Sequence, residues 1–210
     1  MEKNNGKIVA VVALAIAVVA LSVGFAAFAA TLTIDSNATI TASNAFTDKV
    51  NYVTDTPKCY YTGGSTTADG SVAGSASAKS WTGVKVALSD EHKSVTCEAD
   101  VLNASEYVAY LRQISIGGTL TCASKGTGDA AATNADTICG TVSALVEVKT
   151  DSATFNTTTS TAVTNTSSSI AAGGTEHVKL TIAYTSTAKP DGDIDITVPT
   201  ISLLYKTNAS

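Results

Sequence analysis

The 210-residue sequence is poor in charged residues, histidine, proline and tryptophan. Charged side chains make up 15% of the chain, with two His, three Pro and one Trp, and the formal net charge is -5. No Lys/Arg cluster offsets this charge, and the single tryptophan, Trp81, is not interleaved with basic residues. An acidic surface repels phosphate, and base stacking requires aromatic side chains beside basic ones. The composition therefore excludes a nucleic-acid partner.

The sequence also offers few groups for catalysis. His92 and His177 each follow a Glu, but neither has a second His four residues away, so the zinc motif HExxH is absent. No glycine-rich loop stands between a buried strand and a helix, where it could hold phosphate. We therefore expect both His to be solvated surface residues and the chain to have no catalytic residues, no metal site and no cofactor.

One acidic segment has two interpretations. Asp191, Asp193 and Asp195 alternate with other residues, and hard cations such as calcium prefer oxygen ligands of this kind. An EF-hand would carry a Glu at its twelfth position, where this chain has Ser202. A solvated hairpin turn is the favoured interpretation, and calcium binding is the alternative.

The N-terminus has the three parts of a secretory signal. Residues 2–7 are polar and include two Lys, residues 8–30 are apolar, and Ala27-Phe28-Ala29 supplies the small residues that a signal peptidase reads. We predict a signal peptide over residues 1–29 and a single domain over residues 30–210, which touches the membrane only through the leader before cleavage. Removing the leader leaves 11 basic and 17 acidic residues.

A retained helix is the alternative for this segment. The apolar run of 23 residues would reach about 35 Å as a helix, which is enough to span a bilayer. A membrane anchor or a pilin-type helix could have this length. Pilins of type IV usually carry a Glu within the apolar helix, and no acidic residue interrupts residues 8–30.

All four cysteines lie beyond the predicted leader, and none belongs to a CxxC motif. An even number in an exported chain indicates disulfides rather than a reduced metal site. Of the three possible pairings we favour Cys122 with Cys139, which flank a loop of small residues, and therefore Cys59 with Cys97. The predicted location is secreted, on the cell surface or outside the cell.

Residues 31–42 alternate strictly between two kinds of side chain. Every even position is apolar or small and every odd position is polar, which is the period of a β-strand. The segment could extend about 40 Å, twice the length of an ordinary strand. It therefore either bends into two strands or reaches beyond its own domain. Its residues include Thr31, Leu32, Thr33, Ile34, Ala38 and Ile40.

Similar alternation recurs along the rest of the chain and predicts an antiparallel β-sandwich. A phase change at Pro199 predicts a bulge or bend in the last strand. Apolar residues over 105–116 follow helical spacing, so this segment is either a short helix or not helical, and neither alternative is favoured. Residues 63–79 and 151–174 contain few large apolar residues and are predicted to be surface loops. The expected strands are 49–54, 84–89, 94–99, 118–122, 142–149, 177–185 and 193–206.

Five Asn-x-Ser/Thr sequons occur, and a chain this rich in Ser and Thr has several by chance. They are glycan acceptors only if the source organism glycosylates exported Asn. The five positions are Asn37, Asn103, Asn156, Asn165 and Asn208.

Two parts of the chain resemble TasA/camelysin-type exported proteins. The junction SVGFAAFAATLTIDSNATITA has a small-aromatic-small leader end that runs directly into an alternating strand, and GGTE precedes the strand HVKLTIAYT before a final strand ISLLYK. The likeness covers about 20 residues at the front and about 30 at the back. Archaeal bundling pilins are similar in plan.

This resemblance implies a secreted jelly-roll subunit that polymerises into a pilus or a biofilm matrix fibre. In such fibres the N-terminal strand of one subunit completes the sheet of the next, so the partner would be a second copy in a head-to-tail homopolymer. The alternating segment from Thr31 to Ile40 is the expected donor. Camelysins are described as metalloproteases, but this chain lacks HExxH, so we expect no enzyme activity.

A monomeric adhesin or carbohydrate-binding module is the alternative function. Its sugar platform would consist of Trp81, Tyr52, Tyr60 and Tyr61, although a role in the hydrophobic core is the favoured interpretation of these aromatic residues.

Overall fold

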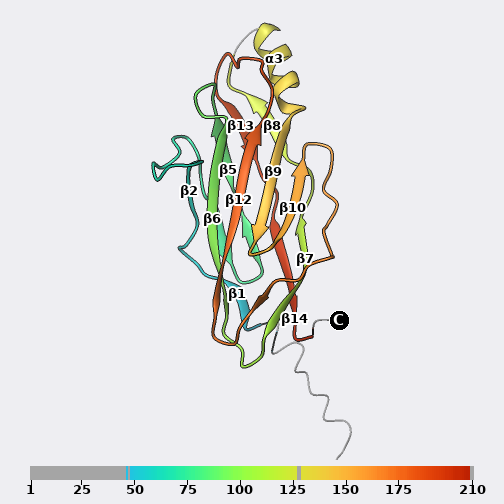
Figure 1. Ribbon diagram of the computed structural model, residues 1–210. Helices are drawn as coiled ribbons and strands as arrows, with labels where there is room; N and C mark the ends of the chain where they lie inside the picture. The colour runs from blue at the N-terminus through green and yellow to red at the C-terminus, as the bar shows by residue number, and fades with distance from the viewer. Residues whose placement is uncertain (1–45, 47, 127–128, 209–210) are drawn as a thin grey trace, which may run out of the picture. The chain divides into compact units, whose positions relative to one another are not determined.

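The computed structural model describes Phe46, residues 48–126 and residues 129–208, all within one compact unit (Figure 1). The predicted leader, the alternating segment 31–42 and the Asn37 sequon lie outside the described residues. Within the described residues, no helix is long and apolar enough to cross a membrane. Every strand pair is antiparallel, and two layers of strands form the predicted β-sandwich.

The first layer is a six-stranded sheet in the order β1-β6-β12-β9-β10. The short strands β1 and β2 pair with successive halves of the long strand β6, so together they form one edge. Its strands are β1 (Val50–Tyr52), β2 (Lys58–Tyr61), β6 (Ser94–Asn103), β9 (Val142–Val148), β10 (Asp151–Asn156) and β12 (Thr175–Tyr184).

The second layer consists of two sheets, ordered β11-β7-β14-β4-β3 and β5-β13-β8. Three chain segments continue from one sheet into the other, through residues 83–84, 117–120 and 198–200. Two of these connections contain residues that interrupt a strand. Pro199 has no backbone N–H to donate to a neighbouring strand, and Gly83 has a φ of 73°, which few other residues adopt. The strands are β3 (Ser75–Ser77), β4 (Ser80–Thr82), β5 (Lys85–Leu88), β7 (Ala109–Ile116), β8 (Thr121–Ser124), β11 (Ser169–Ile170), β13 (Ile194–Thr197) and β14 (Ile201–Lys206).

The core lies between the layers and follows the alternation of the strands. In β12, for example, Val178, Leu180 and Ile182 are completely buried, while the residues between them face outward. Each such side chain contributes about 1.5–3 kcal/mol by leaving water. Trp81 and Phe155 are the largest of the completely buried side chains.

The seven strand predictions beyond residue 42 are confirmed, with shifted ends, and the last of them is divided at Pro199 as expected. Residues 105–116 do not form a helix. They form a turn and strand β7, and the register against β14 shifts between Leu204 and Tyr205. Because of this irregularity, Leu111 and Ile114 both face the core although they are three residues apart. Apolar residues three apart are also typical of a helix, which is why the sequence allowed that alternative.

Both predicted loops contain strands. Residues 63–79 include β3, and residues 151–174 include β10 and β11, because Ala153 and Phe155 reach the core from an otherwise polar stretch. One short helix, α3 (Asp129–Cys139), lies where the sequence predicted a loop of small residues. Ile138 anchors it in the core, and Gly140 N–H donates to the carbonyl of Asp136 at its end.

Both predicted disulfides are present. Cys59 of β2 and Cys97 of β6 are directly opposite in the strand register, and Cys122 of β8 joins the last residue of α3, Cys139. The described residues contain no free cysteine. Since disulfides persist in oxidising compartments, the two bonds are consistent with an extracellular environment.

Asp151 fixes the start of β10 to the segment that leads into β11. Its carboxylate accepts hydrogen bonds from the backbone N–H groups of Ser167 and Ser168, at 2.8 and 2.6 Å. Burial raises the pKa of this carboxyl, but the hydrogen bonds from Ser168 and Ser167 outweigh it, so the pKa lies below its ordinary value.

Removing the first disulfide with Cys59→Ser and Cys97→Ser should lower the free energy of unfolding by about 3–4 kcal/mol, because the bond closes a loop between residues 38 apart. Urea denaturation measures the loss. Reduction of the parent protein is the control, and alkylation of unreduced protein should find no free thiol. Two alkylatable cysteines would contradict the paired state.

Asp151→Ala should destabilise the fold by about 2 kcal/mol near neutral pH, because two amide groups lose a charged acceptor. The pKa of this carboxyl is lower in the folded chain than in the unfolded chain, where it is about 3.9. The ionised carboxylate therefore stabilises the fold above about pH 3.9, and this stability is lost as the pH falls through the pKa of the folded state. The difference between parent and variant should therefore be constant above about pH 5 and shrink below about pH 4. Urea denaturation across this range, with the exposed Asp69→Ala as control, checks both statements; a difference that does not change with pH would contradict the role of the charge.

Candidate functional site

Strand β14 is paired along only part of one edge. On one side β7 accompanies it from Ile201 to Lys206, but on the other side β4 pairs only with Ile201 and Ser202. Among the described residues, no strand lies beside this second edge from Leu203 to Lys206. An unpaired strand edge exposes backbone N–H and C=O groups that can pair with another chain.

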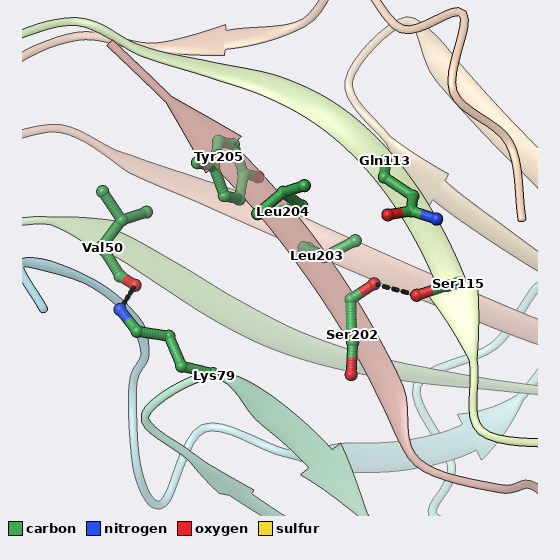
Figure 2. A pocket seen from close by; sticks show the side chains of 8 residues that line it. All are labelled: Val50, Lys79, Gln113, Ser115, Ser202, Leu203, Leu204 and Tyr205. Carbon is green, nitrogen blue, oxygen red and sulfur yellow. Dashed lines mark hydrogen bonds between the residues drawn. The ribbon is translucent and has the colours of Figure 1, made fainter. Parts of the chain in front are cut away.

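A groove of about 410 Å³ follows this open edge, between β14 and β1 (Figure 2). We call it the β14 groove. Leu203 and Tyr205 reach it from the inner face of β14, whereas Leu204 lies on the outer face and is 42% exposed. The groove is lined by Val50, Lys79, Gln113, Ser115, Ser202, Leu203, Leu204 and Tyr205.

The turn between β3 and β4 fixes the wall of the groove that β1 forms. Lys79 Nζ donates to the carbonyl of Val50 at 2.7 Å and to Asn51 Oδ1 at 2.9 Å. The N–H of Tyr52 donates to the carbonyl of Ala78 at 2.7 Å. Burial lowers the pKa of Lys79, and the charge of Asp48 opposes this effect. These contacts hold β1 to the second layer, so the wall is preformed.

Two buried tyrosines lie at this site: Tyr205 lines the groove, and Tyr52 lines a smaller space beside it. Tyr52 and Tyr205 are each 5% exposed, and in the described part of the chain neither hydroxyl has a hydrogen-bond partner. Both side chains line a residual space of about 10 Å³ that adjoins the groove. Burial raises the pKa of both, so the two hydroxyls stay protonated. Buried polar groups are normally paired, so these hydroxyls are exceptions at this site.

An open backbone edge, apolar walls and unpaired hydroxyls suit the binding of an extended polypeptide. A strand laid along β14 would satisfy backbone groups and cover apolar side chains in one step. The predicted donor residues, Thr31 to Ile40, lie outside the described residues.

The other candidate site residues are dispersed. His177 is exposed, with Nδ1 2.5 Å from Asp100 Oδ1, and His92 stacks on the ring of Tyr61 at 3.6 Å between centroids. Asp195 pairs with Lys125 at 3.0 Å. No group of three His, Cys, Asp or Glu side chains that could hold a metal ion occurs among the residues that the structure describes.

The four aromatic residues of the possible sugar platform do not share a surface. Trp81 is completely buried, and its Nε1 donates to the carbonyl of Ala73 at 2.7 Å. Tyr52 is buried beside the β14 groove, while Tyr60 and Tyr61 are only partly buried on β2. The interpretation of Trp81 and Tyr52 as core residues is confirmed, and a platform made of all four residues is wrong.

The described sequons differ sharply in access. Asn103 is completely buried: its Nδ2 donates to the carbonyls of Tyr107, Ile170 and Ala171, and its Oδ1 accepts from the backbone N–H of Ser105. In the folded chain Nδ2 is fully engaged by these carbonyls, so Asn103 has a structural role, and glycosylation at this position stays a prediction for the chain before it folds. Asn165 and Asn208 are exposed, and Asn156 is partly buried.

Sequence reasoning missed the β14 groove. Its lining comes from three separate strands and a turn, and no local pattern relates Lys79 to Tyr205. The one available signal was the phase change after Pro199, which predicted an irregular last strand but not that a neighbouring strand ends early.

Comparison with known proteins adds no relative. No family model matches the chain, and no curated protein matches it.

Asn103→Ala should destabilise the fold by about 3 kcal/mol, because it removes the three hydrogen bonds that Nδ2 donates and the acceptor of the Ser105 N–H. The exposed Asn165→Ala is the matched control and should change stability by less than about 0.5 kcal/mol. Thermal or urea denaturation measures both. Equal stability of the two variants would contradict the structural role of Asn103.

Proposed function

We propose that the protein is a structural subunit of an extracellular filament, such as a pilus or biofilm matrix fibre, that polymerises by donor-strand exchange. The observation that carries this proposal is the β14 groove, where, among the described residues, β14 has no neighbouring strand beyond Ser202 on the side of β4. The N-terminal segment of one subunit inserts there beside β14 of the next.

The apolar and polar faces of the donor segment match the inner and outer sides of the groove. The segment alternates between polar and apolar residues over positions 31–42 and contains no Pro, so every residue can pair. The groove has one apolar inner side, formed by Val50, Leu203 and Tyr205, and one outer side open to solvent. An alternating strand presents one face to each side.

The geometry of such a contact gives an open chain of subunits. The donor and the acceptor are different surfaces of the same molecule, so the contact is heterologous, and repetition produces a filament instead of a closed dimer. Further apolar side chains near the end of the sandwich that holds β1 and the C-terminal end of β14 would extend this contact (Figure 1). Tyr107, 61% exposed, and Val108, 38% exposed, precede β7 at this end.

Export also favours this function. A predicted signal peptide and two disulfides suit a subunit that works outside the cell, where no chaperone refolds it. The work of such a subunit is mechanical, and it requires no catalytic group. Glycans at Asn156, Asn165 and Asn208 are compatible with this role if the source organism glycosylates exported proteins.

The alternative function, a monomeric adhesin or carbohydrate-binding module, loses its main support. Its aromatic platform required Trp81 and Tyr52 at the surface, and both are buried.

Deleting residues 31–40 from the exported chain should abolish filaments in electron micrographs and leave a folded monomer, because the described residues from Phe46 onward form a hydrophobic core among themselves. A peptide of residues 30–42 should then bind this monomer and stabilise it by about 2.7 kcal/mol when present at 100 times its dissociation constant. A peptide of the same composition without the alternation is the control. Filaments that persist after the deletion would exclude donor-strand exchange.

A pair of surface substitutions tests the acceptor side. Leu204→Lys places a charge at the groove and should weaken filament formation at least tenfold, whereas Val72→Lys, at a site 55% exposed and outside the groove, should not. Because both positions are exposed, both variants should fold with parent stability. The yield of filaments sedimented at equal protein concentration measures the difference. Equal yields of the two variants would show that the β14 groove is not the acceptor site.

A further inference from the structure

The hydrogen bonds of β7 decide which backbone groups of β14 face the open edge. Ile114 exchanges both of its backbone hydrogen bonds with Val163, at 2.9 and 3.0 Å, and so directs neither group toward β14. In an antiparallel pair, two residues directly opposite each other either exchange both bonds or both turn their groups outward. Ile114 is opposite Leu203, so the N–H and C=O of Leu203 turn away from β7.

The same holds for Tyr205, two residues further along β14. The N–H of Leu111 donates to the carbonyl of Ser168 at 2.9 Å, and its carbonyl accepts from Thr166 Oγ1 at 2.7 Å. Leu111 is opposite Tyr205, so the N–H and C=O of Tyr205 also turn away from β7. Leu204, between the two, faces β7. The open edge therefore offers two residues, each with one donor and one acceptor.

The opposite wall of the groove has its backbone groups already bonded to the turn between β3 and β4. The N–H of Tyr52 donates to the carbonyl of Ala78, and the carbonyl of Val50 accepts from Lys79 Nζ. Beside Leu203 and Tyr205, in contrast, no described strand lies on the side of β4. An extended chain in the groove therefore finds its backbone partners on β14 (Figure 2).

We propose that the backbone N–H and C=O groups of Leu203 and Tyr205 form the hydrogen-bonding edge for the strand of the next subunit. This inference rests on the proposed function and names the atoms by which the acceptor binds the donor. Both residues lie on the inner face of β14, so a strand residue opposite either one turns its side chain into the groove. Because every residue except Pro carries these backbone groups, the edge recognises an extended chain with apolar inward side chains and not one particular sequence.

Hydrogen exchange in the full exported chain tests the inference without any substitution. The experiment compares dilute monomer with filaments and reads each amide by NMR after the exchange is quenched. The amide hydrogens of Leu203 and Tyr205 should exchange about a hundredfold more slowly in filaments than in the monomer, because they gain an acceptor there. The amide of Leu204, which faces β7, is the internal control and should be protected in both states.

A proline substitution tests the N–H of Leu203 separately. Leu203→Pro removes a donor that faces no strand in the described chain, so the subunit should fold, as thermal denaturation can verify. Leu203→Ala is the matched control, because it also loses the leucine side chain but keeps the N–H. The yield of sedimented filaments should be about tenfold lower for Leu203→Pro than for Leu203→Ala. Equal yields from two folded variants would contradict the inference, and the exchange experiment decides if Leu203→Pro does not fold.

The outcomes separate this inference from the proposed function. If the amides of Leu203 and Tyr205 exchange equally fast in monomer and filaments, the donor does not pair with this edge, while filaments that still depend on residues 31–40 uphold donor-strand exchange. If the deletion of residues 31–40 leaves filaments intact, the proposed function fails, and this inference fails with it.

Discussion

The constraint on which the proposed assembly depends is the need of backbone groups at a sheet edge for a hydrogen-bond partner. In the second layer β4 ends after two paired residues, and β14 continues alone on that side in the described chain. Other edges of the sandwich are blunted: the segment that carries Thr67 and Ala68 bonds to β2, and Val163 and Ile170 bond to β7. At β14, in contrast, the described residues supply no such partner beyond Ser202 on the side of β4.

Polar contacts between distant segments hold the rest of the sandwich together around this opening. Lys79 ties β1 to the turn between β3 and β4, Asp151 ties β10 to the segment that leads into β11, and Asn103 joins the end of β6 to Ile170 of β11. Each contact links segments that are distant in the sequence. A preformed groove binds its occupant without the cost of ordering loops, so this rigidity favours tight assembly.

Much of the architecture could be predicted from alternation, because strands with one buried face have a period of two. The long strands β9 and β12 carry that pattern and lie where it predicts them, and β6 (Ser94–Asn103) begins as predicted but runs past the predicted end at residue 99. The pattern failed where a bulge broke the period, as at Leu111 and Ile114 of β7, and where a strand carried only two apolar residues, as with Ala153 and Phe155 of β10. The disulfides were paired correctly from spacing and compartment. The β14 groove could not be predicted from the sequence. It exists because β4 pairs with only two residues of β14, and the length of this pairing depends on tertiary packing.

Asn103 has a consequence for the order of events during export. Its amide is an acceptor by sequence in the unfolded chain, yet in the fold it is the centre of a closed hydrogen-bond network. In a cell that glycosylates exported proteins, a sugar added before folding would occupy the place that the carbonyls of Ile170 and Ala171 need. Folding of β6 against the segment after β11 and glycan transfer are then competing reactions. In such a cell, the rate of one against the other would decide what fraction of the chains reaches the described fold.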